Sequence, residues 1–181
     1  LDGGWRETEM FLNWFSQTPA THRVLIAGNH DWSFEDIIEA RSYCESLGIE
    51  YMYNEYTELD GLILYGSPIQ TNLTDWAFYG KPSAKYWEDL EAPIDILVTH
   101  NTPYGLGDRV LKLRLGENDF HIGDKFLRDK VEIVAPRYHI YGHIHEGRGG
   151  YRYDNGITKA FNVASLDYRY NNIYEPVVWN M

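Results

Sequence analysis

The chain has 181 residues, of which 44% are hydrophobic and 24% are charged, a balance typical of one compact domain that needs no disulfide to fold. The single cysteine, Cys44, excludes a disulfide framework, and no apolar run approaches the ~18 residues of a membrane span. A net charge of −11 argues against broad binding to nucleic acid or to an anionic membrane, because both need excess Lys and Arg. We expect a cytoplasmic protein, although a chain that begins at Leu1 would not show an N-terminal signal.

The first half of the chain alternates between helix-like and strand-like segments. Apolar residues at helical spacing predict a helix over residues 8–15. Ser33 is expected to cap a second helix, which Gly48 ends. Short apolar runs predict strands at residues 23–27, 49–53 and 62–65. A further helix is expected over residues 83–91.

The second half of the chain becomes richer in strands. We expect a strand at residues 94–99, a short helix at 125–130 and a strand at 138–141. The remaining predicted strands cover residues 150–153, 158–163 and 177–179, with a hairpin turn at Asp154-Asn155-Gly156. No repeat or linker divides the chain, so we expect one α/β domain over residues 1–181, with a sheet covered by helices.

Residues of metal-ligand type follow three of the predicted strands. They are Asn29 and His30 after the first strand, His100 after the fourth, and His143 and His145 after the fifth. Ligand sites of open α/β sheets lie beyond the carboxyl ends of the strands. A single such histidine is more often a surface or packed residue, and Gly-Asn-His-Asp could be a simple turn. The coincidence at three strand ends favours a metal site.

The residue types in these segments suit a transition metal. His143 and His145 are two residues apart, so on an extended segment both imidazoles point to one face, whereas on a helix they would diverge by about 200°. Imidazole favours Zn, Fe, Mn, Ni or Cu over Ca. Asn29 offers a neutral oxygen ligand, and the carboxylate of Asp31 could orient His30 and fix its tautomer.

Five stretches in chain order resemble one known family. They are VLIAGNHD at 24–31, YGSP at 65–68, THNTPYG at 99–105, GHIHEG at 142–147 and FNVAS at 161–165. Together they resemble the calcineurin-like metallophosphoesterase superfamily, and within it the metallophosphoesterase domain-containing (MPPED-like) branch. The resemblance implies a four-layer α/β/β/α sandwich around two divalent metal ions, with manganese favoured and iron or zinc as alternatives.

The resemblance also implies roles for individual residues. The implied metal ligands are Asn29, His100 and His143 on one ion and His145 on the other. His30 would contact the substrate phosphate and protonate the leaving oxygen, and Asp31 would orient His30. The implied reaction is attack on phosphorus by a metal-bridging hydroxide. Two divalent ions also add positive charge, so an anionic phosphate could approach this acidic chain.

The sequence departs from the family pattern at its start. The Asp-x-His and Gly-Asp motifs that supply the other ligands are absent, and Asp2 is the only nearby candidate. We therefore expect an N-terminally incomplete sandwich, cropped from a complete enzyme, and little or no activity from residues 1–181 alone. The alternatives are that another chain supplies the missing piece, or that the protein is an inactive remnant or a nucleotide- or metal-binding module.

Substrate and partners follow from family analogy alone. We expect a small phosphate ester, such as a nucleotide, cleaved as a phosphodiester rather than as a phosphomonoester. Asn101 and His121 are candidate substrate contacts, although Asn101 could instead cap a turn and His121 could belong to a structural loop. We expect no membrane partner, and the sequence makes no prediction of oligomeric state.

Overall fold

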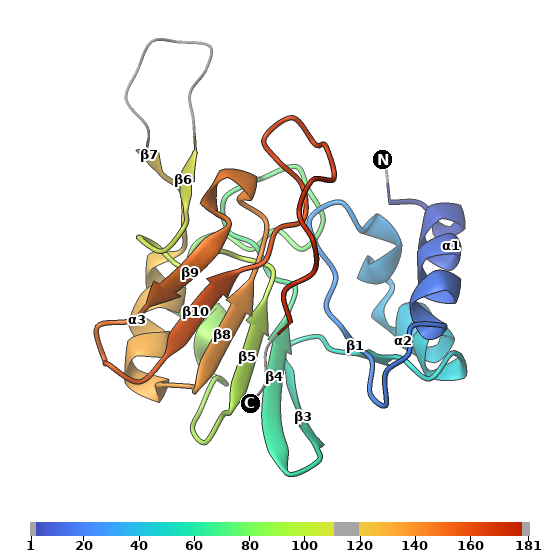
Figure 1. Ribbon diagram of the computed structural model, residues 1–181, viewed down its shortest axis with the longest axis horizontal. Helices are drawn as coiled ribbons and strands as arrows, with labels where there is room; N and C mark the ends of the chain where they lie inside the picture. The colour runs from blue at the N-terminus through green and yellow to red at the C-terminus, as the bar shows by residue number, and fades with distance from the viewer. Residues whose placement is uncertain (1–2, 111–119, 179–181) are drawn as a thin grey trace.

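A computed structural model describes residues 3–110 and 120–178. Its centre is a six-stranded sheet with strand order β3-β4-β5-β8-β10-β9 (Figure 1). The strands are β3 (Glu55–Leu59), β4 (Leu62–Ser67), β5 (Ile96–Thr99), β8 (Tyr138–Tyr141), β10 (Lys159–Asn162) and β9 (Gly149–Arg152). The inner four are parallel, and β3 and β9 pair antiparallel at the two edges. The carboxyl ends of the four parallel strands therefore meet at one end of the sheet.

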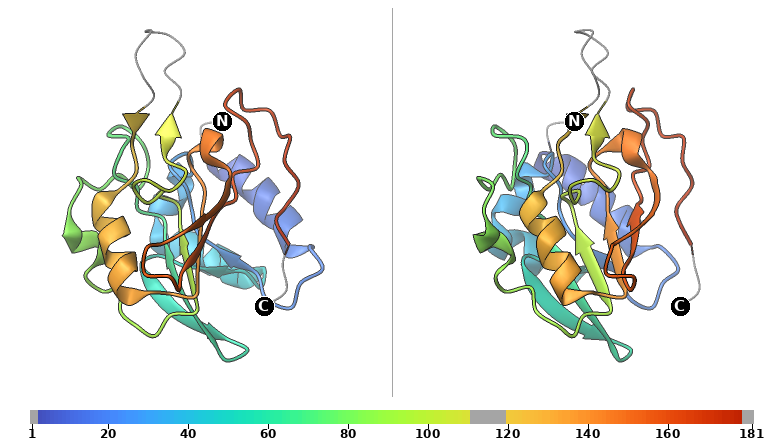
Figure 2. Two further views of the ribbon diagram at one scale, coloured as in Figure 1. Left: turned by 60° about the vertical axis from the view of Figure 1, so that its left-hand side comes forward. Right: turned by 90° about the vertical axis from the view of Figure 1, so that its left-hand side faces the viewer.

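One face of this sheet forms the larger hydrophobic core. The covering elements are the helix α3 (Lys125–Val134) and the 3-10 turn η2 (Ala84–Trp87). Leu127, Val131 and Trp87 from these elements are buried against Leu97 and Tyr141 of the sheet. Figure 2 shows α3 lying along this face. The apolar residues of β5 and β8 thus fix where their carboxyl ends emerge.

A second, smaller core lies beside the sheet (Figure 1). It is built from α1 (Trp5–Ser16), β1 (Val24–Leu25), η1 (Trp32–Glu35), α2 (Ile37–Ser46) and β2 (Glu50–Tyr51), with β1 and β2 paired in parallel. Leu12, Phe34, Cys44 and Tyr51 are buried together within it. This unit carries the segment that leaves β1 toward the carboxyl ends of the central strands.

The remaining elements lie at the carboxyl end of the parallel strands. They are the paired strands β6 (Arg109–Val110) and β7 (Phe120–His121) and the 3-10 turn η3 (His145–Gly147). Figure 2 shows this ribbon and η3 at the same end of the molecule. No helix in the described ranges is long and apolar enough to cross a membrane.

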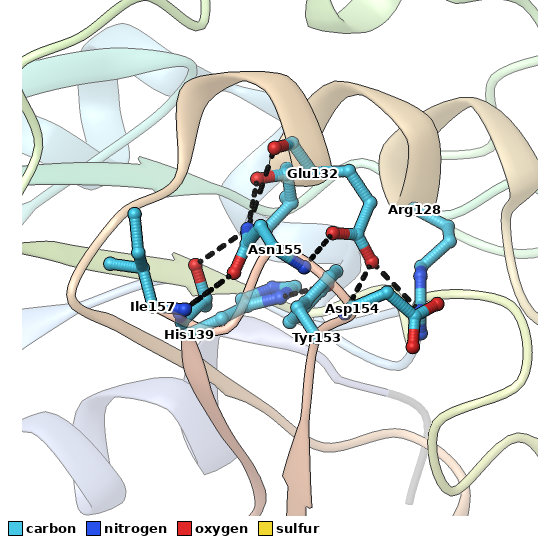
Figure 3. Close-up of polar contacts among 9 residues, drawn as sticks. Arg128, Glu132, His139, Tyr153, Asp154, Asn155 and Ile157 are labelled. Carbon is cyan, nitrogen blue, oxygen red and sulfur yellow. Dashed lines mark hydrogen bonds and ion pairs between the residues drawn. The ribbon is translucent and has the colours of Figure 1, made fainter.

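The turn between β9 and β10 is tied to α3 (Figure 3). The Asn155 side-chain oxygen accepts hydrogen bonds from the backbone amides of Ile157, at 2.9 Å, and Thr158, at 3.0 Å. The Glu132 carboxylate accepts from the amides of Asp154 and Asn155, at 3.0 and 2.8 Å. This is the hairpin turn predicted from Asp154-Asn155-Gly156, and the structure adds its attachment to a helix.

The expected α/β class with a helix-covered sheet is confirmed, but several elements differ from the prediction. Ser33 does not cap α2, because its hydroxyl lies 2.6 Å from that of Thr8, and the side chain of Asp36 caps the helix instead. Residues 83–91 form only the 3-10 turn η2, and Val177 and Val178 lie in no strand, while Trp179 falls outside the described residues. The extent of the domain over residues 1–181 stays a prediction.

Candidate metal centre

Three segments from distant parts of the sequence converge at the carboxyl ends of β1, β5 and β8. The Nε2 atom of His100 lies 2.8 Å from Oδ1 of Asn29. The rings of His100 and His143 lie 4.6 Å apart, centroid to centroid. His30 and His145 are close enough for their charges to act on both of these imidazoles. The structure thus brings together all the predicted metal ligands, together with His30.

Gly28 is required by the close approach of His100. A Cβ atom at this position would lie 2.7 Å from Cε1 and 2.9 Å from Nδ1 of the His100 ring. Any side chain at position 28 would therefore push the imidazole away from Asn29. The glycine of Gly-Asn-His-Asp is therefore explained by close packing against His100 rather than by a turn conformation.

His143 does not lie on the extended segment that the sequence predicts. Its φ angle is +69°, a left-handed conformation that is uncommon for residues other than glycine, and His145 begins the 3-10 turn η3. Neighbouring hydrogen bonds hold this backbone. Thr102 donates to the Gly142 carbonyl and Asn162 to the Ile144 carbonyl, each at 2.8 Å. A strained residue held in this way is characteristic of functional sites.

The environment keeps two of the imidazoles neutral. Burial, followed by the neighbouring charges of His143, His30 and His145, lowers the pKa of His100 well below its usual value. Burial, followed by His145 and His30, lowers the pKa of His143 to about 4. A neutral imidazole keeps one nitrogen lone pair, which is the form that binds a metal ion. The cluster is therefore ready to act as a ligand set at neutral pH.

Hydrogen bonds also identify which nitrogen is free. Nδ1 of His145 lies 2.9 Å from the carbonyl oxygen of Asp167. Since a carbonyl only accepts, Nδ1 carries the proton and Nε2 carries the lone pair. His100 Nε2 lies 3.2 Å from the Asn29 backbone nitrogen, whose N–H donates to it, and 2.8 Å from the Asn29 side-chain oxygen. An imidazole nitrogen and an amide oxygen are both ligand atoms for a transition-metal ion.

The donors present fit part of a dinuclear site. Within residues 3–110 and 120–178, no group of three or more His, Cys, Asp or Glu side chains is arranged to hold a metal ion. The cluster instead pairs His100 with the amide of Asn29 and with the ring of His143. This set suits a transition metal but contributes no carboxylate. Asp2, the only nearby carboxylate noted in the sequence, lies outside the described residues.

His30 and Asp31 lie at the edge of the cluster. The His30 ring packs edge-to-face against Trp76, with centroids 4.2 Å apart. The Asp31 carboxylate accepts from the Gly28 amide at 2.7 Å, and burial raises its pKa, partly offset by this bond and by the charge of His30. The hydrogen bond of Asp31 thus closes the turn, and the role of Asp31 in orienting His30 stays a prediction.

The two predicted substrate contacts lie in different surroundings. Asn101 is fully buried, and its Nδ2 donates to Thr71, at 3.0 Å, and to Asp124, at 3.2 Å. His121 is partly exposed on β7, with Nδ1 2.6 Å from the buried carboxylate of Asp108. Asn101 therefore lies in a network beneath the site, and His121 on the neighbouring ribbon. Substrate contact by either residue stays a prediction.

The structure adds two residues that the sequence did not single out as partners of histidines. Asn72, after β4, places its side-chain oxygen 3.0 Å from Nε2 of His143. Tyr170 packs edge-to-face against His145, with centroids 5.0 Å apart. A polar stretch after a strand was the only available signal for Asn72. Tyr170 lay in a tyrosine-rich segment that is more often packing.

Comparison with known proteins agrees with this geometry. A family model described as calcineurin-like phosphoesterase matches residues 1–147. Metallophosphoesterase domain-containing protein 1 of Homo sapiens is 29% identical over 198 residues, which cover 95% of this chain and 59% of that protein. UPF0046 protein C25E10.12 of Caenorhabditis elegans is 28% identical over 190 residues, covering 90% and 63%. The chain thus spans about three-fifths of these relatives.

A solved structure supports the fold. TT1561 of Thermus thermophilus superposes with a TM-score of 0.60 at 15% identity, over 88% of this chain and 69% of that one. The likeness is to the α/β sandwich and carries no statement about activity. The family match covers most of the chain, and the human and mouse relatives carry the name of the branch that the motifs resemble. The chain belongs to the calcineurin-like phosphoesterase family, in the branch of the metallophosphoesterase domain-containing proteins.

Proposed function

We propose that this chain provides the metal-binding core of a phosphodiesterase with a dinuclear metal site. Family membership supports the coarser statement, a metal-dependent hydrolase acting on phosphate esters. The observation that carries the proposal is the convergence of Asn29, His100 and His143 from three strand ends, with His100 Nε2 2.8 Å from the Asn29 side-chain oxygen. The amide oxygen and the imidazole nitrogens of these residues are ligand atoms that suit a transition-metal ion.

The proposed ligands divide between two ions. Asn29, His100 and His143 would hold one ion, and His145 would contribute to the other through its free Nε2. Bound divalent ions, manganese first and iron or zinc as alternatives, supply Lewis-acid charge that activates water and neutralises phosphate. The chain's own contribution is to keep His100 and His143 neutral by burial and to hold the His145 ring through Nδ1 at the Asp167 carbonyl.

His30 is the proposed substrate contact and proton donor. Its ring is held by Trp76 at 4.2 Å, which limits its rotation. The Gly28 amide fixes the nearby Asp31 carboxylate in place. In this arrangement His30 stabilises the phosphate charge and delivers a proton to the leaving oxygen. We propose a small phosphodiester substrate such as a cyclic nucleotide, and a cytoplasmic location.

One observation favours a second candidate function. The proposed ligands are imidazoles and one amide, without a carboxylate among them, and within the described residues no group of three or more His, Cys, Asp or Glu side chains could hold a metal ion. Neutral ligands hold a divalent cation without offsetting its charge, which suits a module that binds metal together with an anionic nucleotide. In this alternative the chain binds its ligand without turnover.

A paired measurement distinguishes the two functions. Mn²⁺ affinity is measured by isothermal titration calorimetry, and hydrolysis by release of p-nitrophenol from bis-p-nitrophenyl phosphate. His143→Ala should lower Mn²⁺ affinity by more than about 100-fold, since loss of an outer hydrogen-bond partner alone costs about 10–100-fold. The exposed Thr74→Ala, on the neighbouring loop, is the matched control.

The outcomes separate cleanly. Hydrolysis that requires both Mn²⁺ and His143 supports the enzyme. Mn²⁺ binding that requires His143 without any hydrolysis favours the binding module. If His143→Ala binds Mn²⁺ and hydrolyses the ester as Thr74→Ala does, both functions are overturned at this site.

A further inference from the structure

We infer that Asn72 is a positioning residue for His143, and that its side-chain oxygen fixes the tautomer in which Nδ1 of His143 is free to bind a metal ion. This inference rests on the metal site proposed above and assigns a role to a residue outside the predicted ligand set. Asn72 belongs to the loop after β4, 71 residues from its partner. It touches the site through His143 alone.

The contact between the two side chains has a direct chemical meaning. Oδ1 of Asn72 lies 3.0 Å from Nε2 of His143. An amide oxygen offers only lone pairs, so the hydrogen bond requires the imidazole proton on Nε2. The lone pair of a neutral ring is then on Nδ1, which no hydrogen bond reaches within residues 3–110 and 120–178. A ligand histidine that donates its other N–H to an oxygen is the usual arrangement around protein-bound metals.

The loop that carries Asn72 is itself held rigidly. Gln70 is fully buried, and its Oε1 accepts from the backbone amides of Asn72, at 3.2 Å, and Leu73, at 2.9 Å. Its Nε2 donates to the Leu73 carbonyl at 2.7 Å. Further along, the Ala77 amide donates to the Asn29 carbonyl at 3.1 Å. The amide of Asn72 is therefore presented from a framework anchored to another proposed ligand.

Two features of Asn72 and His143 indicate that their contact serves to orient the imidazole and not only to fill space. His143 adopts a left-handed backbone conformation, with φ +69°, that costs free energy. Nδ2 of Asn72 is buried without a hydrogen-bond partner among the described residues, which also costs free energy. An amide retained there despite an unpaired donor is explained if its oxygen is needed at His143.

The opposite amide orientation makes an opposite prediction. With Nδ2 facing His143, Nε2 would be the acceptor and the proton would be on Nδ1, where it would block metal binding at that nitrogen. The tautomer of His143 therefore decides the inference.

The first test reads that tautomer without metal or activity. Side-chain ¹⁵N–¹H correlation spectra of the chelator-treated protein distinguish protonated from unprotonated imidazole nitrogens, and loss of signals in His143→Ala identifies those of His143. We expect the Nε2–H tautomer in the unmodified protein and in Thr74→Ala. Asn72→Ala should give a mixture of tautomers, and Asn72→Asp, which keeps an oxygen acceptor, should restore Nε2–H. An Nδ1–H tautomer in the unmodified protein overturns the inference.

The second test reads the consequence for metal binding. Asn72→Ala should weaken Mn²⁺ affinity by about 10–100-fold, Asn72→Asp should stay close to the unmodified protein, and the melting temperature without metal should be the same for both variants. If His143→Ala leaves Mn²⁺ affinity unchanged, the proposed function itself fails. If His143→Ala abolishes binding but Asn72→Ala matches Thr74→Ala, only the positioning role fails.

Discussion

Replacing His139 by glutamine should reduce the acid sensitivity of the fold by about one proton. His139 is fully buried on β8 beneath the hairpin turn, next to Tyr153 (Figure 3). The Thr99 hydroxyl donates to the Asn101 carbonyl at 2.7 Å and so must accept from Nε2 of His139, at 2.9 Å. Nδ1 then accepts from the Tyr153 hydroxyl at 2.7 Å. Both ring nitrogens are satisfied by the neutral form.

Burial lowers the pKa of His139 from 6.5 to about 3. The unfolded chain therefore takes up a proton near pH 6.5, whereas the folded chain resists it until about pH 3. The contribution of His139 to stability is complete above pH 6.5 and is lost as the pH falls through this window. One proton changes the free energy of unfolding by about 1.36 kcal/mol per pH unit. Between pH 6.5 and 4.5 the loss from this residue is about 2.5 kcal/mol.

Urea denaturation at a series of pH values, with chelator present, measures this contribution. His139→Gln lowers stability at every pH because it disturbs two hydrogen bonds, so the informative quantity is the slope against pH. Between pH 6 and 4.5, the slope of the unfolding free energy against pH should be smaller than in the unmodified protein by the equivalent of about one proton, or about 1.36 kcal/mol per pH unit. Thr74→Ala, at an exposed residue that does not titrate, is the control and should keep the full slope. An unchanged slope in His139→Gln would refute the reasoning.

Two further substitutions test how the site is built. Gly28→Ala should weaken Mn²⁺ binding about tenfold or more, because its Cβ would lie 2.7 Å from the His100 ring. In the control Gly142→Ala, the new Cβ meets no atom within 4 Å, so this variant should bind Mn²⁺ normally. Equal calorimetric affinities of the two variants would contradict this reasoning. Asp124→Ala should lower the free energy of unfolding in urea by about 3 kcal/mol or more, because the indole of Trp87 and two other buried donors lose their acceptor. A loss below about 1 kcal/mol would show that the network is not needed.

The buried strands were predictable because their sequences are continuous apolar runs. β5 and β8 lie inside the sheet with a parallel strand on either side, and their residues are buried or partly buried. The edge strand β3 was missed because Glu55–Leu59 alternates partly buried with exposed residues and carries two glutamates. The sequence signal for this strand lay instead in the Asp60-Gly61 turn that follows it. Asp60 and Gly61 both have positive φ angles, 52° and 79°, as expected for a tight hairpin turn of Asp-Gly type.

The start of α2 shows where local sequence is insufficient. Ser33 and Asp36 are both suitable caps, three residues apart. The choice depends on Thr8, which lies 25 residues earlier and binds the Ser33 hydroxyl. That contact exists only because α1 packs beside η1 in the smaller core. A local pattern can therefore identify the helix while a long-range contact selects the residue that caps it.

The predicted ligands were likewise recognisable from local sequence, whereas the residues that orient their side chains depend on long-range contacts. Asn29, His100 and His143 were found because imidazole and amide groups at strand ends are chemically conspicuous. The partners of His143 and of His145 are ordinary groups, namely the amide of Asn72 and the backbone carbonyl of Asp167. Because a carbonyl or amide oxygen is present in every turn, only the fold can show which one meets an imidazole. The nitrogen that each histidine presents is thus decided by loops, after the strands have brought the rings together.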